Sequence, residues 1–185
     1  MLCIGACMVF VEGMLAHFFN TQYSKSLEFG GVLLGVAGVV YSATSFVLGS
    51  LRSCFPRLLE VFLVGGLVGA GAVLPFIGPL IHLPGLTNLV TSVCAFNLLP
   101  VCSCAIQLNC LTVSAQALTR HVSSEQAMSV AMNTINLAYN VGAFVGPVVG
   151  GFLLERWGFA EVFATGSPFF LVSAVVFMIN VLLRA

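Results

Sequence analysis

This sequence is most informative between Gly142 and Gly151, where it reads Gly-Ala-Phe-Val-Gly-Pro-Val-Val-Gly-Gly inside a longer apolar run. Gly142, Gly146 and Gly150 recur every four residues, so they share one face of a helix. Because that face has no side chains, a neighbouring helix can approach it closely. Pro147 removes a backbone donor and is expected to bend or weaken the helix there. The motif, including Gly151, therefore predicts a helix suited to close packing and conformational change.

The composition of the chain identifies the solvent that surrounds it. Charged residues make up 6% of the 185 residues, whereas hydrophobic residues make up 59%. A soluble domain carries about 25% charged residues, so a water-facing surface cannot be built from this set. We conclude that the chain is an integral, multi-pass membrane protein in contact with the lipid bilayer. Its net charge of zero gives no electrostatic reason to expect a nucleic-acid partner.

Apolar stretches that approach the length of a membrane span, about 20 residues, occur six times. Charges, glycines and prolines divide them into spans at about 1–19, 30–51, 60–81, 86–118, 127–154 and 160–183. The first span lacks the basic start of a signal peptide, so we interpret it as a spanning helix. The fourth is too long for one perpendicular crossing, so either its first turns are loop or the helix is tilted, and Asn97 and Pro100 interrupt it. Since the connections are short, we predict one all-α domain of six antiparallel transmembrane helices, 1–185.

The basic residues and a weak similarity between two of the spans predict how the six spans are arranged. On one side lie Arg52, Arg57, Arg120 and Arg184, and on the other lie Lys25 and Arg156. This excess predicts that both termini are cytosolic. The second and fifth spans both carry glycine near their ends, with a basic residue shortly after, which suggests two inverted sets of three helices.

Glu12 is the sharpest single candidate for a functional residue. It lies within the first span, with apolar residues on both sides. An unpaired carboxylate at the centre of a membrane costs roughly 2.5–3.5 kcal/mol on insertion scales, and desolvation favours its protonated form. This behaviour suits a proton carrier or a counter-ion for a cationic substrate. The alternative is a structural Glu that is hydrogen-bonded to a neighbouring helix.

Polar side chains also gather in the fourth and fifth spans. Asn133, Asn136 and Asn140 follow i, i+3, i+7 spacing and form one polar stripe. Such a stripe either lines an aqueous cavity or joins helices by hydrogen bonds, and both interpretations stay open. Asn136 is the best single candidate for the cavity. Tyr139 offers a hydroxyl or an aromatic face to a cation, and Gln116 is a further polar group near the end of the fourth span.

Motifs of enzymes and of cofactor sites are not visible in the sequence. It contains neither a P-loop nor a nucleophile elbow. Cys102 and Cys104 have no His or acidic residue at metal-ligand spacing. We therefore expect neither a catalytic site nor a bound metal or cofactor.

Three segments carry a resemblance to a known family of carriers. They are Val11-Glu12-Gly13-Met14-Leu15, Arg120-His121-Val122-Ser123, and Val141 to Pro147 followed by Gly150-Gly151 and Trp157-Gly158-Phe159. They resemble the seventh helix, the loop after the tenth helix, and the eleventh helix with its exit in the C-terminal half of a major facilitator superfamily carrier. Within that superfamily, the chain is similar to the vesicular amine transporters, which handle monoamines, acetylcholine and polyamines.

This resemblance implies secondary active transport by alternating access, with protons exchanged for small organic cations. It implies that Glu12 corresponds to an acid important for transport and Asn136 to an acidic position of the eleventh helix. The substrate and proton pathway would comprise Glu12, Gln116, Asn133, Asn136, Tyr139 and Asn140. The implied partner is an N-terminal six-helix half, and the implied location is a vesicle or other organelle membrane, or otherwise the plasma membrane.

The chain departs from the pattern of the group at two positions. Gly13 stands where the group has Pro after the Glu, and Leu118 stands where monoamine carriers have an acid before the Arg-His pair. The second departure leaves a polyamine-like or another substrate open. The alternatives to a transporting half are a non-transporting membrane interaction subunit, which packs through the same glycine face, and an inactive truncated carrier fragment.

Overall fold

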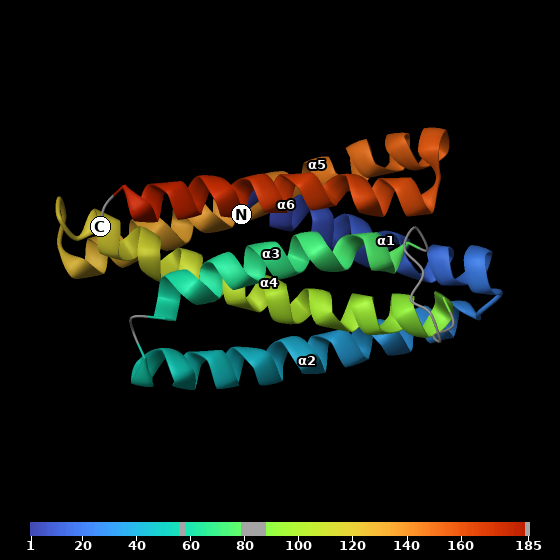
Figure 1. The fold of residues 1–185 in the computed structure, drawn as a ribbon, viewed down its shortest axis with the longest axis horizontal. Helices are drawn as coiled ribbons and strands as arrows, with labels where there is room; N and C mark the ends of the chain where they lie inside the picture. Colours follow the sequence, from blue (N-terminus) through green and yellow to red (C-terminus); the bar gives the residue numbers. More distant parts are fainter. Residues whose placement is uncertain (56–57, 79–87, 184–185) are drawn as a thin grey trace.

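The computed structural model describes residues 1–55, 58–78 and 88–183, with the backbone alone for residues 2–4, 52, 53 and 182. Six helices follow one another: α1 (Leu2–Tyr23), α2 (Leu27–Cys54), α3 (Leu59–Ile77), α4 (Asn88–Leu118), α5 (Ser124–Trp157) and α6 (Phe159–Leu182). Each runs antiparallel to the one before it, so the described residues form an up-and-down bundle without strands (Figure 1). The predicted all-α fold of six helices is confirmed.

Local capping sets the helix ends, which differ by a few residues from the predicted spans. α2 begins three residues earlier than expected because the Ser26 hydroxyl accepts a hydrogen bond from the Phe29 N–H. α1 continues through polar residues to Tyr23 and ends where Ser24 adopts the left-handed conformation, φ 51°. Gly158, at φ 87°, reverses the chain between α5 and α6 in a single residue, a conformation that favours glycine.

The helices run through their prolines. α4 is one helix of 31 residues, so the predicted interruption at Asn97 and Pro100 is wrong. The Asn97 side-chain amide donates a hydrogen bond of 2.9 Å to the Val93 carbonyl oxygen within the same helix. Pro100 removes only one hydrogen bond of the helical ladder, and membrane helices tolerate such a loss. α5 likewise continues across Pro147.

Five helices, α2 to α6, are long and apolar enough to cross a membrane among the described residues. α1 falls below that criterion over its described part, which contains Glu12, His17, Asn20 and Gln22. Its 22 residues nevertheless correspond to about 33 Å of helix, slightly more than the roughly 30 Å of a bilayer core. α1 lies alongside α5 within the bundle (Figure 1).

The packing pairs relate the first three helices to the last three. In an inverted repeat, α1 corresponds to α4 and α2 corresponds to α5. The packing of α1 on α5 then corresponds to the packing of α4 on α2. α3 and α6, the third members, pack on each other. Because each triplet holds an odd number of antiparallel helices, α1 and α4 run in opposite directions (Figure 1), as an inverted repeat requires.

The glycine face of α5 packs on α1. Gly142, Gly146 and Gly150 are all buried. A Cβ added to Gly146 would overlap backbone atoms of Ala6, and one added to Gly150 would overlap the ring of Phe10. Gly151 points elsewhere, since a Cβ there would meet open space. Gly146 and Gly150 therefore bring α5 close to α1, and Gly151 takes no part in this contact.

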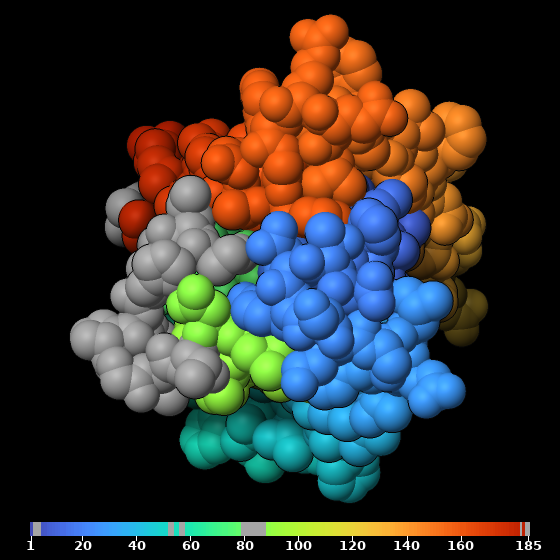
Figure 2. Space-filling model, turned by 90° about the vertical axis from the view of Figure 1, so that its right-hand side faces the viewer, coloured from blue at the N-terminus to red at the C-terminus, as the bar shows by residue number. Residues whose placement is uncertain are grey.

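An aromatic core joins the end of α1 to the start of α6. The buried Phe18 ring lies 5.3 Å from the ring centroids of both Phe159 and Phe163 and 5.8 Å from that of Tyr23. Tilted and edge-to-face pairs of this kind are favourable beyond their buried area. Viewed from this end, α1 (blue) lies between the α5–α6 turn (orange) and α2 (lighter blue; Figure 2).

A hydroxyl group joins α6 to α3 beside a proline. Pro75 has no N–H, so the Gly71 carbonyl, four residues earlier, lacks its helical donor. The buried Ser167 hydroxyl donates to this carbonyl oxygen. The hydrogen bond therefore repairs the helix and fastens the third helices of the two triplets to each other.

Candidate functional site

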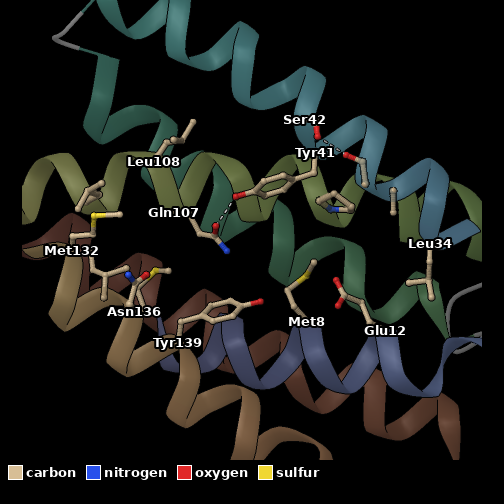
Figure 3. Close-up of a pocket in the computed structure, with 16 residues that line it drawn as sticks. Met8, Glu12, Leu34, Tyr41, Ser42, Gln107, Leu108, Met132, Asn136 and Tyr139 are labelled. Carbon is tan, nitrogen blue, oxygen red and sulfur yellow. Dashed lines mark hydrogen bonds between the residues drawn. The ribbon is translucent and has the colours of Figure 1, made fainter.

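A cavity of about 820 Å³ lies among α1, α2, α4 and α5 (Figure 3). Leu34, Leu108, Leu111, Met8 and Met132 make much of its wall apolar. Its polar groups are Glu12, Tyr41, Ser42, Gln107, Asn136 and Tyr139. Concave apolar sites of about 300–1,000 Å³ with a few converging polar groups are typical of small-molecule binding.

The contact between α1 and α5 positions two walls of this cavity. A Cβ on Gly5 would overlap the Tyr139 carbonyl oxygen, so α1 touches the α5 backbone at the level of Tyr139. Glu12 follows Gly5 by seven residues, about two turns, and therefore lies on the same side of α1. The Glu12 carboxylate and the Tyr139 ring consequently point into one cavity (Figure 3).

Hydrogen bonds between side chains join α2 to α4 on the other side. The Tyr41 hydroxyl donates to Gln107 Oε1 at 2.6 Å (Figure 3). One turn further along, Ser45 Oγ and Cys104 Sγ lie 3.2 Å apart. These contacts fix the Tyr41 ring and the Gln107 amide at the cavity wall.

The Glu12 carboxylate faces the cavity and has no fixed partner in the part of the chain that the structure describes. It is exposed in this six-helix unit, and no hydrogen bond or ion pair holds it among the described residues. A structural Glu fastened to a neighbouring helix would have such a bond. The arrangement leaves both carboxylate oxygens free to bind a proton or a cation.

The structure brings three of the six candidate residues together and leaves three apart. Glu12, Asn136 and Tyr139 line the cavity, whereas Gln116, Asn133 and Asn140 are exposed outside it. Helical periodicity explains this division on α5. The cavity face is Met132, Ile135, Asn136 and Tyr139, and at 100° per residue Asn133 and Asn140 are rotated to the adjacent side of the helix.

Sequence reasoning did not select Tyr41, Ser42 or Gln107 as site residues, although all three line the cavity. A signal was present for the first two, because consecutive hydroxyl side chains in the middle of an apolar span are unusual at membrane depth. Which polar residues of α2 and α4 meet depends on the register of the two helices, and spacing within one helix does not contain that information.

Comparison with known proteins places this geometry in context. Residues 1–184 match the Major Facilitator Superfamily. The chain is similar to the MFS-type transporter SLC18B1 of Rattus norvegicus, with 26% identity over 94% of this chain and 39% of the relative. It is equally similar, at 26% identity, to the Mus musculus protein of the same name, of which it covers 38%. The chain thus spans about two fifths of these relatives, and no solved structure matches it significantly.

Proposed function

Since this chain belongs to the Major Facilitator Superfamily, a family of membrane transporters, we propose that it forms one six-helix half of a carrier that exchanges protons for organic cations by alternating access. The observation that supports this most strongly is the cavity shared by Glu12, Asn136 and Tyr139, which come from two different helices. Titratable groups inside a membrane protein commonly mark ion and substrate pathways.

Each cavity residue has a role in the proposed cycle. Glu12 takes a proton when the cavity faces the acidic compartment and takes the charge of the substrate when it faces the cytosol, so the two ligands compete for one carboxylate. Tyr139 offers its ring face to the cation, and the Asn136 amide supplies a hydrogen bond. Gln116, Asn133 and Asn140 lie outside this cavity and would serve along the path leading to it.

The partner in this proposal is a second six-helix half. α2 and α5 flank the cavity and carry many exposed apolar side chains, among them Val39, Phe46, Leu137, Phe144 and Val148. The similar transporters are more than twice as long as this chain. A carrier with two halves binds its substrate between them, so the partner half would close the cavity.

The proposed orientation places both termini in the cytosol and the carrier in a vesicle or other organelle membrane, with the plasma membrane as the alternative. Arg120 lies between α4 and α5, at the end of the bundle away from Lys25 and Arg156. Arg57 and Arg184, which contribute to the predicted excess of positive charge, lie outside the described residues.

The packing of α5 weakens the proposal of a non-transporting interaction subunit. That alternative requires the glycine face to be open to another protein. Gly142, Gly146 and Gly150 are instead buried within this chain, with Gly146 and Gly150 packed on α1.

The test is transport by the full-length gene product, reconstituted in proteoliposomes whose lumen is acidic. Labelled 1,4-diaminobutane, phenethylamine and choline are offered outside, and uptake is compared with and without a protonophore. We expect at least one amine to accumulate and the protonophore to abolish the accumulation. If no amine moves at any pH gradient, the carrier proposal is wrong and the interaction-subunit alternative gains.

A further inference from the structure

Two hydroxyl groups on α2 present oxygen atoms, rather than protons, to the cavity. Tyr41 donates its hydroxyl proton to Gln107 Oε1 at 2.6 Å. Ser42 donates its own to the Gly38 carbonyl oxygen of the same helix at 2.9 Å. A hydroxyl carries one proton and two lone pairs. With both protons engaged, each oxygen can only accept a further hydrogen bond.

The carboxylate of Glu12 adds a third acceptor from the neighbouring helix. Ionised carboxylates accept hydrogen bonds and cannot donate them, and Glu12 lines the same cavity as Tyr41 and Ser42. The walls formed by α1 and α2 therefore offer three hydrogen-bond acceptors. A cation with N–H donors complements acceptors of this kind, whereas a quaternary ammonium has no N–H and would rely on charge and aromatic faces alone.

Gln107 is the residue that keeps Tyr41 in the accepting state. Without the Gln107 oxygen, the Tyr41 hydroxyl could turn its proton into the cavity. It would then repel an incoming N–H group instead of accepting a hydrogen bond from it. Gln107 lies on α4 and acts on the substrate through Tyr41, so it is a positioning residue.

We propose that Gln107 makes this cavity selective for cations that carry N–H groups over quaternary ammonium ions, by holding the Tyr41 hydroxyl as an acceptor. This inference rests on the proposed function and names the substrate class of the same cavity: protonated primary and secondary amines.

The test measures competition in the proteoliposome assay with labelled 1,4-diaminobutane. Butylamine and butyltrimethylammonium compete for uptake, and the measured quantity is the ratio of their inhibition constants. A hydrogen bond to a charged group corresponds to about a tenfold effect or more, so the unsubstituted carrier should favour butylamine by at least about tenfold. In Gln107→Leu the ratio should fall by about fivefold or more.

Three further variants separate positioning from general damage. Gln107→Glu retains an acceptor for the Tyr41 proton and should keep the selectivity. Tyr41→Phe should also lose selectivity, and adding Gln107→Leu to it should cause no further loss, because Gln107 acts only through the Tyr41 hydroxyl. Gln22→Leu is the matched control, since Gln22 is exposed at the end of α1 outside the cavity.

The outcomes distinguish this inference from the proposed function. Unchanged selectivity in a Gln107→Leu carrier that still transports overturns the inference and leaves the carrier proposal standing. Equal inhibition by the two competitors in the unsubstituted carrier likewise overturns the inference and leaves the carrier proposal standing. Failure of the unsubstituted carrier to move any of the amines overturns both. If Gln107→Leu does not assemble, Tyr41→Phe gives the same comparison, and full selectivity in that variant contradicts the inference.

Discussion

Replacement of Gly146 by alanine should loosen the contact that positions the cavity. The added methyl carbon would lie 2.5 Å from Cα and 2.6 Å from the carbonyl carbon of Ala6. Carbon atoms in contact need about 3.5 Å, so the α1 and α5 backbones must part by about 1 Å. A gap of that size forfeits roughly a quarter to a half of each dispersion contact along the interface. Overpacking against rigid atoms costs about 1–3 kcal/mol; we expect the upper end, because backbone cannot move aside.

The assay is thermal unfolding of the purified, detergent-solubilised protein. The measured quantity is the fraction of protein that stays monodisperse after heating to each temperature. A loss of about 3 kcal/mol corresponds to roughly 6–12 °C for a domain of this size. Gly151→Ala is the control on the same helix, since its methyl group would meet open space. It should be neutral or slightly stabilising, by up to about 1 kcal/mol, through helix propensity. Equal unfolding temperatures for the two variants would refute the close packing of α1 on α5.

Two further substitutions test the bundle. Ser167→Ala leaves the Gly71 carbonyl without a donor beside Pro75. This should lower the free energy of unfolding by about 0.6–1.7 kcal/mol. Unchanged thermal stability would show that this carbonyl needs no partner. Phe18→Ala empties a fully buried ring site against Phe163 and should cost about 3–5 kcal/mol, measured as a lower unfolding midpoint; a loss below about 1 kcal/mol would contradict the aromatic core.

The parts of the fold that depend on spacing within one helix were predictable from the sequence. Glycines four residues apart share a face wherever the helix lies, so close packing at Gly142, Gly146 and Gly150 followed from their spacing alone. The low charge and six apolar runs likewise predicted the membrane class and the number of helices. Gly151 was grouped with the motif through its sequence neighbours, but it lies about 100° around the helix from Gly150.

Features that depend on how the helices pack against one another could not be predicted from the sequence. Asn133 and Asn136 share a polar stripe, yet the position of α1 and α2 decides which side of that stripe meets the cavity. Tyr41 and Gln107 are 66 residues apart, and only the register of α2 against α4 makes them partners. The continuity of α4 through Pro100 was also unpredictable from a local rule, because the surrounding bundle compensates for one missing hydrogen bond.

The most direct test of the proposed function is proton-driven uptake by Glu12→Gln in the full-length carrier. Glutamine keeps the shape and hydrogen-bonding capacity of a protonated Glu and removes the ability to exchange a proton. Uptake of labelled amine is measured at several lumenal pH values, with protein amount in the vesicles matched to the unsubstituted carrier. The proposed function predicts that accumulation in Glu12→Gln becomes independent of the pH gradient and falls to the level seen with a protonophore. Accumulation that responds to the gradient as in the unsubstituted carrier would contradict it.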